Sequence, residues 1–345
     1  MATRVGHPRR ILILAPFFSP DANKGGSWID DFSERPDLQF KKAPYPTAPK
    51  SWHKRGAVTP LGEWLNHIRY VRQALQWRTD CVVTSFPQLA LVASVLLSLQ
   101  GSRKTRLIAW NFNLGSLNNA WKGRLVGRLL GRADRFIVHA RGEIEPYAAW
   151  LGISTDRFRF VPLQQGLVRQ LPASPIPAPY LVSLGSAQRD FPTLIEAVLG
   201  TGIKTVVISK RSFLDQLPEH PDLIKLSGLS MTECNSILAG ATINVTPIRP
   251  THTAAGQITF INAMQLGVPT VATRCVGTVD YIHDGETGLL TPPGDALAMR
   301  VAIESLWSDA PLRERIGAAA KAHVLQHCSD EAAGRHLSRI IAEVS

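Results

Sequence analysis

The sequence predicts an α/β protein with two doubly wound domains, each a mostly parallel sheet covered by helices. Three observations support this fold class. Short runs rich in Val, Ile and Leu alternate with longer segments of helical periodicity along the whole chain. A proline-rich segment interrupts this alternation near the middle of the chain. Finally, 345 residues with an apolar fraction of 45% suit two globular domains better than one.

The first block of alternation contains short apolar runs of strand length with helical segments between them. We expect strands at 10–16, 81–84, 105–110, 134–139 and 158–162, and helices at 59–76, 89–99, 121–130 and 143–151. The stretch 35–54 is rich in Pro and Lys, has little periodicity and is expected to be irregular.

The second block follows the segment Leu171–Pro179, which has four prolines in nine residues and is typical of an extended linker. We expect strands at 180–185, 204–209, 241–247 and 270–272, and helices at 191–199, 232–239, 259–266, 296–307, 310–326 and 330–344. The predicted domains are 1–168 and 180–328, with a linker at 169–179 and a C-terminal helix at 329–345. Because such sheets bind ligands at the carboxyl ends of their strands, we expect the two domains to face a cleft.

The net charge of +11 is concentrated in the first half of the chain. Residues 1–165 hold 24 Lys and Arg against 11 Asp and Glu, whereas residues 166–345 hold 14 against 16. The basic half predicts an anionic partner, either a phosphorylated substrate or a membrane surface. Nucleic acid is disfavoured because no recognition motif accompanies the charge. The four cysteines lack disulfide or metal-site spacing, and neither a signal peptide nor a membrane span is evident, so we expect a cytoplasmic protein.

The most specific stretch of the sequence runs from Ala254 to Asp295. Gly256 precedes a segment of helical periodicity, and this helix is expected to end at Gly267, before Pro269. A loop of small residues at a helix N-terminus offers N–H groups and the positive end of the helix dipole, and both favour phosphate. The loop Gly256–Thr259 is therefore a candidate phosphate-binding site.

Two motifs in this stretch, Asn262-Ala-Met-Gln-Leu-Gly-Val-Pro-Thr-Val-Ala272 and Asp284-Gly-Glu-Thr-Gly-Leu-Leu290, resemble the C-terminal domain of GT-B glycosyltransferases of the large retaining family 4. The resemblance covers residues 180–325 well and residues 9–165 loosely. It implies a Rossmann-like acceptor-binding domain, then a Rossmann-like domain for the nucleotide sugar, and a C-terminal helix that returns to the first domain. It implies no metal or other cofactor.

The two glutamates typical of the family are replaced here by Ala254 and Asn262. In the family the second glutamate binds the ribose of the nucleotide and the first contacts the donor sugar. Asn262 can still hydrogen-bond a hydroxyl, more weakly than a carboxylate, whereas Ala254 cannot. We expect Gln257 to take over a polar contact at the reacting sugar. The other residues expected to line the donor in this stretch are His252, Gly256, Ile258 and Thr259.

The segment Gly185-Ser-Ala-Gln-Arg-Asp-Phe-Pro-Thr-Leu-Ile-Glu-Ala197 resembles a second family motif, in which a lysine grips the donor diphosphate. Arg189 stands at the lysine position, and its guanidinium can bind a diphosphate through two bonds and offset the charge of the leaving group. A solvated surface arginine beside Asp190 is the alternative. The resemblance also places Lys210 near the nucleotide and Leu229 in the loop at the nucleobase, and Lys210 is equally compatible with a surface role.

In the first half, Gly25 and Gly26 follow the first strand and resemble the family's glycine loop, where backbone approaches the donor phosphate or the acceptor. A plain turn is the alternative. The family often has a histidine after the fourth strand, where this chain has Asn111. Asn111 can orient the acceptor or the sugar, but it is no general base at neutral pH. A retaining front-face reaction, which the family implies, needs no enzymatic nucleophile because the donor phosphate can itself take the acceptor proton.

The segment 121–132 places Arg124, Arg128 and Arg132 at i, i+4 and i+8 of a helix, with Trp121 near the same face. A basic amphipathic face suits an anionic bilayer surface, and a merely solvated helix is the alternative. Because many members of the family glycosylate lipid-linked acceptors, we expect peripheral contact with the inner face of the membrane.

The resemblance thus predicts a hexosyltransferase-type enzyme. It would move a sugar from a nucleotide diphosphosugar to a glycan or lipid-linked acceptor, with retention, in bacterial cell-surface polysaccharide synthesis. Two alternatives stay open. A sugar-nucleotide epimerase on the same fold would need acid–base carboxylates and histidines, of which the sequence shows few. The replacements at Ala254 and Asn262 are also compatible with a non-catalytic partner subunit.

Overall fold

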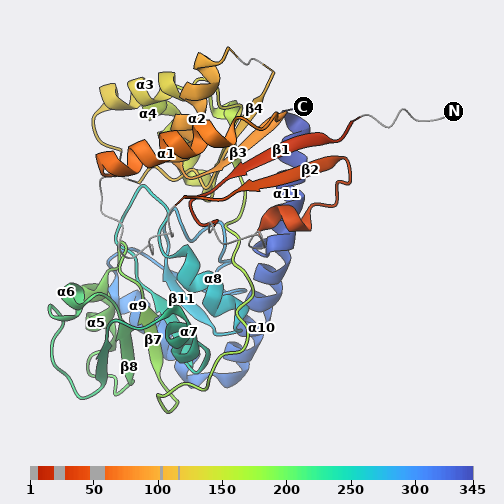
Figure 1. Ribbon diagram of the computed structural model, residues 1–345. Helices are drawn as coiled ribbons and strands as arrows, with labels where there is room; N and C mark the ends of the chain where they lie inside the picture. The colour runs from red at the N-terminus through yellow and green to blue at the C-terminus, as the bar shows by residue number, and fades with distance from the viewer. Residues whose placement is uncertain (1–6, 19–27, 47–58, 102–103, 116, 345) are drawn as a thin grey trace. The chain divides into compact units, whose positions relative to one another are not determined.

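The computed structural model describes residues 7–18, 28–46, 59–101, 104–115 and 117–344. Contacts within the chain divide it into two compact units, residues 1–161 with 333–345, and residues 162–332. Each unit contains one parallel sheet of six strands with helices packed on it (Figure 1). The predicted α/β class with two doubly wound domains is therefore confirmed.

The sheet of the first unit has the strand order β2-β1-β3-β4-β5-β6. Its strands are β1 (Arg9–Leu14), β2 (Leu38–Ala43), β3 (Cys81–Ser85), β4 (Arg106–Trp110), β5 (Arg135–Val138) and β6 (Phe158–Phe160). Its α-helices are α1 (Leu61–Ala74), α2 (Pro87–Leu99), α3 (Ala120–Leu129), α4 (Ile144–Leu151) and α11 (Asp330–Glu343). The short 3₁₀ helices are η1 (Ile29–Phe32), η3 (Arg141–Glu143) and η4 (Thr155–Arg157).

Strand β2 corrects the prediction that residues 35–54 are irregular. It pairs with β1 in parallel, from Leu38 opposite Arg9 to Ala43 opposite Leu14. Its ends are buried, but the exposed Lys41 lies between them. An edge strand with a charged residue in its middle has no continuous apolar run, which is why the sequence pattern did not predict it.

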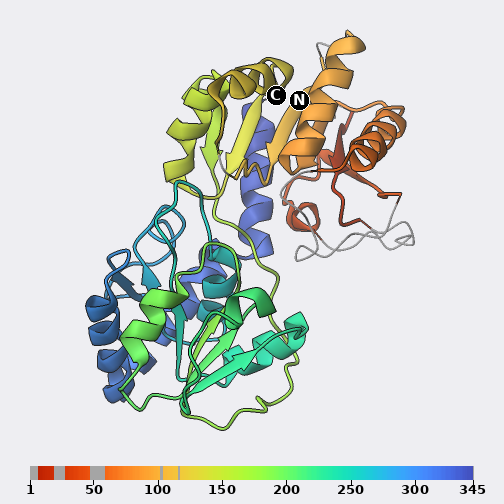
Figure 2. The same cartoon turned by 90° about the vertical axis from the view of Figure 1, so that its left-hand side faces the viewer.

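Helices cover both faces of the first sheet. Leu12 of β1 points into a core with Val71 of α1 and Ala93 of α2. Ile13 points to the opposite face, where Leu337 and Ile341 of α11 complete a second core. Figure 2 shows the C-terminal helix, in blue, beside the strands of the first sheet. The C-terminal helix therefore returns to the first sheet, as the GT-B fold implied.

The sheet of the second unit has the order β12-β11-β10-β7-β8-β9. Its strands are β7 (Leu181–Leu184), β8 (Thr205–Ile208), β9 (Leu223–Leu226), β10 (Ile243–Thr246), β11 (Thr270–Thr273) and β12 (Leu289–Thr291). Its helices are α5 (Phe191–Val198), α6 (Arg211–Leu214), α7 (Met231–Ala239), α8 (Gln257–Gln265), α9 (Ala296–Ser308) and α10 (Ala310–His327). The sequence analysis did not predict β9, β12 or α6, which have four residues or fewer and too little pattern for detection.

The proline-rich segment 171–179 contains neither helix nor strand and packs on the second unit. The Ser236 hydroxyl of α7 lies 2.8 Å from the carbonyl oxygen of Pro172 and 3.1 Å from that of Ala173. The second unit itself begins at Pro162, ahead of the predicted linker at 169–179.

Candidate functional site

The second sheet has a topological switch point between β7 and β10. Strands β8 and β9 lie on one side of β7, whereas β10, β11 and β12 lie on the other. Doubly wound sheets bind ligands outside the carboxyl ends of the strands at such a point, because the connecting loops diverge there. In this protein an antiparallel bridge between Arg189 and Ile248 joins the loops that follow β7 and β10.

Arg189 lies at this switch point with only 5% of its surface exposed. Its Nε donates to the carbonyl oxygen of Leu184 at 3.0 Å, and its Nη1 donates to that of Ala187 at 2.9 Å. Its Nη2 donates to Thr259 Oγ1 at 3.0 Å, in the first turn of α8. These three bonds fix the guanidinium between the end of β7 and the start of α8.

The Arg189 guanidinium is a buried charge with no acidic partner in the described segments of the chain. A guanidinium has five N–H donors, and two of these have no acceptor among the residues that the structure describes. Burial lowers the pKa of Arg189 to about 10, so the group stays charged at neutral pH. The alternative of a solvated surface arginine is wrong, and Asp190 accepts a hydrogen bond from Thr193 instead. An anionic ligand would stabilise such a charge.

Two glycines make room for this guanidinium. Gly185 has a φ of +112°, and a Cβ built on it would lie 2.4 Å from Arg189 Nη2. Gly256, the N-cap of α8, has a φ of +82°, and its Cβ would lie 2.8 Å from Ile248 and 3.4 Å from Arg189 Nη1. The positive end of the α8 dipole therefore lies beside a fixed guanidinium, and both favour an anion.

A cavity of about 440 Å³ lies on another face of α8. Ile258 and Asn262 line it from α8, Met231, Thr232 and Asn235 line it from α7, and residues 165–171 complete the wall. The Asn262 side chain is buried, and its Nδ2 donates to Asn235 Oδ1 at 3.2 Å. Its Oδ1 has no hydrogen-bond partner within the described part of the chain. A buried carbonyl oxygen of this kind is a ready acceptor for a ligand hydroxyl.

Gln257 occupies the first position of α8, and its side chain is directed into the protein. Its Nε2 donates to the Tyr281 hydroxyl at 3.0 Å, and the same hydroxyl accepts the Leu163 N–H at 2.8 Å. Neither Tyr281 nor Asn235 was among the predicted site residues, because each contacts its partner only through tertiary packing. The role of Gln257 at a reacting sugar stays a prediction.

Three predicted contacts lie on loops around this edge of the second sheet. Lys210 is exposed at the N-cap of α6, and its N–H donates to Ser186 Oγ at 3.3 Å. Leu229 is half-buried and packs on the core behind β9. His252 is exposed, and its side chain forms no hydrogen bond or ion pair with the described residues.

In the first unit, Asn111 follows β4 and lies at the carboxyl edge of that sheet. It has a φ of +51° and is half-buried. Its amide lies 2.9 Å from Ser85 Oγ and 2.6 Å from His139 Nε2. The predicted glycines of this unit, Gly25 and Gly26, lie outside the described residues.

His139 fixes the orientation of the Asn111 amide. The His139 Nδ1 lies 2.7 Å from the carbonyl oxygen of Val161, which can only accept, so Nδ1 carries a proton. Burial lowers the pKa of His139 to about 4, which leaves Nε2 without a proton at neutral pH. In the structure the Asn111 Nδ2 donates to Ser85 Oγ and its Oδ1 lies 2.6 Å from His139 Nε2. A neutral Nε2 can only accept, so we assign the oxygen and nitrogen of this amide the other way round, with the NH₂ toward His139. His139 therefore positions Asn111 and is no general base.

The predicted basic face of residues 121–132 is only partly correct. Helix α3 ends at Leu129, and Arg132 lies beyond it. The Arg132 Nη2 donates to the carbonyl oxygen of Thr105 at 2.9 Å, so this side chain turns toward the sheet. Arg124, Arg128 and Trp121 stay exposed on the helix.

Comparisons with known proteins find a family match within the second unit. Residues 188–309, which include Arg189 and the whole of α8, match the family model Glycosyl transferases group 1. The matched segment includes the loop after β7, the α8 N-terminus and both α-helices that line the cavity.

Individual relatives carry the same class of name. The chain is 40% identical over 68 residues to the capsular polysaccharide biosynthesis glycosyltransferase CapM of Staphylococcus aureus, a match that covers 20% of this chain and 18% of CapM. It is 28% identical over 151 residues to the lipopolysaccharide core biosynthesis glycosyltransferase LpsE of Rhizobium meliloti (strain 1021), a match that covers 41% of this chain and 44% of LpsE. The matched segments thus span less than half of each of these relatives.

A solved structure is similar over nearly the whole chain. Anabaena HepE in complex with UDP-glucose aligns with a TM-score of 0.66 and 15% identity, over 97% of this chain and 98% of that one. At this identity the likeness shows a shared GT-B fold. Within the described residues, no helix has the length and apolar character needed to cross a bilayer.

Proposed function

We propose that the protein is a glycosyltransferase that binds a nucleotide diphosphosugar in its second unit. The observation that carries this proposal is the buried Arg189 guanidinium, which lies at the switch point and has no acidic partner among the described residues. The glycosyltransferase family model that matches residues 188–309 and the names of CapM and LpsE support the reaction class. The UDP-glucose bound to HepE, a protein of the same fold, supports the class of donor.

The donor diphosphate would lie between Arg189 and the N-terminus of α8. The two N–H donors of Arg189 that lack acceptors can each bind a phosphate oxygen. The same charge would stabilise the nucleoside diphosphate as it leaves. Gly185 and Gly256 let the guanidinium take this position, because a Cβ at either residue would approach it.

The nucleoside would occupy the cavity beside α8. Its volume of about 440 Å³ lies within the range of small-ligand sites. The Oδ1 of Asn262 would accept a hydrogen bond from a ribose hydroxyl, the role in which the family uses a carboxylate. Met231 and Ile258 supply apolar walls. Lys210 and Leu229 would approach the nucleotide from neighbouring loops.

The reaction would proceed with retention and without an enzymatic nucleophile. The bond from the anomeric carbon to the donor phosphate oxygen breaks, and its electron pair leaves with the nucleoside diphosphate. The acceptor hydroxyl attacks from the same face and forms the new glycosidic bond, while its proton passes to the leaving phosphate. Asn111, fixed by His139, would orient acceptor or sugar, and Gln257 would contact the reacting sugar. No metal is required in this scheme.

The acceptor would be a glycan or lipid-linked sugar in bacterial cell-surface polysaccharide synthesis, at the cytoplasmic face of a membrane. The curated names of CapM and LpsE, for capsule and lipopolysaccharide, support this setting. The exposed Trp121, Arg124 and Arg128 would contact the anionic membrane surface.

A non-catalytic binding subunit is the second candidate. The observation in its favour is that Ala254 and Asn262 replace the carboxylates that the family uses at the donor. Such a subunit would bind the donor without turning it over, so binding and hydrolysis must be measured separately.

The test is a panel of UDP-, GDP- and ADP-sugars with the full chain. We expect at least one of them to raise the Tm and to be hydrolysed slowly in the presence of the protein. The Arg189→Lys variant should weaken this binding, whereas Lys321→Ala, on the exposed surface of α10, should not. Stabilisation without hydrolysis would favour the binding subunit. If none of the donors raises the Tm, the proposal is wrong.

A further inference from the structure

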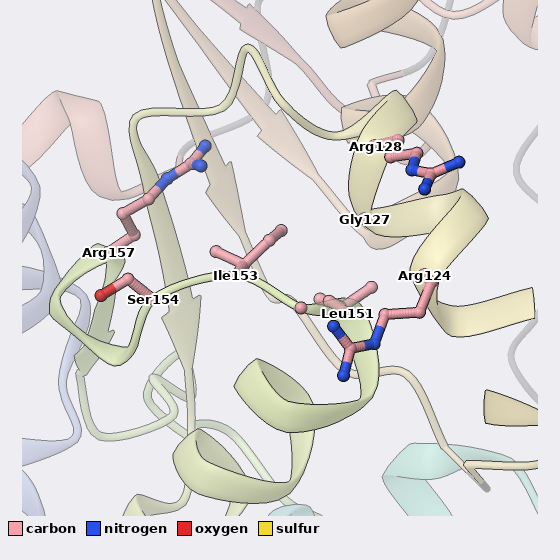
Figure 3. Close-up of a pocket in the computed structure, with 8 residues that line it drawn as sticks. Arg124, Gly127, Arg128, Leu151, Ile153, Ser154 and Arg157 are labelled. Carbon is pink, nitrogen blue, oxygen red and sulfur yellow. The ribbon is translucent and has the colours of Figure 1, made fainter. Parts of the chain in front are cut away.

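A basic cavity of about 430 Å³ lies in the first unit, between α3, the end of α4 and η4. Its lining includes Arg124 and Arg128 of α3 and Arg157 of η4, and no acidic residue. Figure 3 shows the two arginines of α3 on one side of Ile153 and Arg157 on the other. Three arginines therefore line one open depression.

Two glycines bring these arginines to the cavity. A Cβ on Gly123 would lie 2.3 Å from the carbonyl oxygen of Trp150, and one on Gly127 would lie 1.9 Å from that of Leu151. Helix α3 therefore packs backbone to backbone on α4, and this close approach places Arg124 against Gly152 at the end of α4. The adjacent positions, Arg124 and Arg128, follow the rim of the contact.

The side chains of Arg124 and Arg128 form no hydrogen bond or ion pair within the described parts of the chain. Arg157 is partly used, because its Nη2 donates to the carbonyl oxygens of Gly131 and Ala133. The carboxylates of Asp134 and Asp156 interact electrostatically with Arg157 but do not line the cavity. Asp134 also pairs with Arg106 at 3.1 Å, and Asp156 is exposed. The cavity thus keeps donors and positive charge for an external anion.

The outer face of α3 shows what kind of anion fits. Trp121, Leu125 and Leu129 recur at i, i+4 and i+8 and are 67%, 49% and 40% exposed. They lie beside Arg124 and Arg128 and away from the glycines that face α4. A soluble phosphate compound needs no such apolar stripe, whereas an interfacial helix combines apolar side chains with basic ones.

We propose that this cavity binds the phosphate group of an anionic membrane phospholipid while Trp121, Leu125 and Leu129 enter the bilayer interface. This proposal makes the membrane contact of the proposed function more specific. The phosphate would be bound by Arg124, Arg128 and Arg157, and Arg132 would take no part. The site does not depend on sugar transfer, since none of these residues lies in the second unit. The Trp121 indole would lie at the boundary between headgroups and acyl chains, and the arginines would lie among the anionic headgroups.

The experiment measures co-sedimentation of the full chain with vesicles of phosphatidylcholine alone or with phosphatidylglycerol. We expect binding only to the anionic vesicles. The affinity of the double variant Arg124→Ala/Arg128→Ala for these vesicles should be lower by about tenfold or more. The matched control is Arg335→Ala/Arg339→Ala, which removes two exposed arginines at i and i+4 from α11 of the same unit. An equal loss of vesicle binding in both double variants would contradict a specific role of the cavity and indicate non-specific electrostatic attraction.

Two further measurements decide the source of the phosphate. Trp121→Ser should also reduce binding to anionic vesicles, because it removes apolar area that enters the interface. If inorganic phosphate raises the Tm of the wild type but not of the double arginine variant, and vesicles are not bound, the lipid assignment is wrong.

Donor titration of the same variants should match the wild type. Failure of donor binding in every variant would strike the proposed function alone.

Discussion

A basic side chain is buried at the carboxyl edge of each sheet, but one of these side chains is charged at neutral pH and the other is neutral. At the second sheet, Arg189 keeps its charge because two carbonyls and a hydroxyl hold it and its pKa falls only to about 10. At the first sheet, burial lowers the pKa of His139 to about 4, so the imidazole is neutral and serves Asn111. A permanently charged guanidinium can await an anion, whereas a neutral imidazole supports a polar contact. This contrast supports our proposal that the donor phosphates bind at the second edge.

The largest effect in this comparison is expected from Gly185→Ala. The new Cβ would lie 2.4 Å from Arg189 Nη2 at a φ of +112°, so the guanidinium must move. We expect loss of detectable donor binding and a free energy of unfolding lower by about 1–3 kcal/mol. Gly200→Ala is the matched control, because Gly200 also has a positive φ, +78°, but open space around it. Equal effects of both variants on donor titration would refute the role of Gly185.

A smaller effect is expected from Asn262→Ala. The variant removes the amide oxygen that lacks a partner in the cavity, together with the bond to Asn235. We expect donor affinity to fall about fivefold, the value of roughly one neutral hydrogen bond. Isothermal titration with the best donor of the panel measures it. Unchanged affinity would remove the ribose from this cavity.

The first edge is expected to respond to pH rather than to donor. The folded pKa of His139, about 4, lies below the ordinary histidine value of 6.5, so the unfolded chain binds more protons between these values. The stability supplied by the neutral imidazole is thus complete above pH 6.5 and is lost as pH falls toward 4. Relative to His139→Gln, the wild type should lose up to about 1.4 kcal/mol of unfolding free energy per pH unit in this window. Parallel pH profiles of the two proteins would contradict the assignment.

The sequence predicted the fold well where apolar runs are long. Strand β1 and helix α8 are where the pattern placed them, but β2 was missed because Lys41 interrupts its apolar positions. The motif around Arg189 identified the residue and not its burial, since that depends on the bridge to Ile248 and on Thr259 of a distant helix. Local sequence contains neither contact.

The remaining site residues show the same limit. Periodicity placed Arg132 on the face of Arg124, but α3 ends at Leu129 and the chain turns Arg132 toward Thr105. The neighbours of Gln257 and Asn262, Tyr281 and Asn235, come from other elements and carry no motif. The sequence thus proposed which residues belong to the candidate site, whereas their contacts could be seen only in the packed structure.

The most direct test of the central claim compares a nucleoside with its diphosphate. For the base that binds best, we predict that the wild type binds the nucleoside diphosphate more tightly than the nucleoside, and that Arg189→Lys reduces this difference by about 10-fold to 100-fold while leaving nucleoside affinity unchanged. Lysine keeps the charge but lacks the planar set of donors. Circular dichroism and Tm establish that the variant is folded. An unchanged ratio of the two affinities in folded Arg189→Lys would contradict the assignment of the donor diphosphate to Arg189.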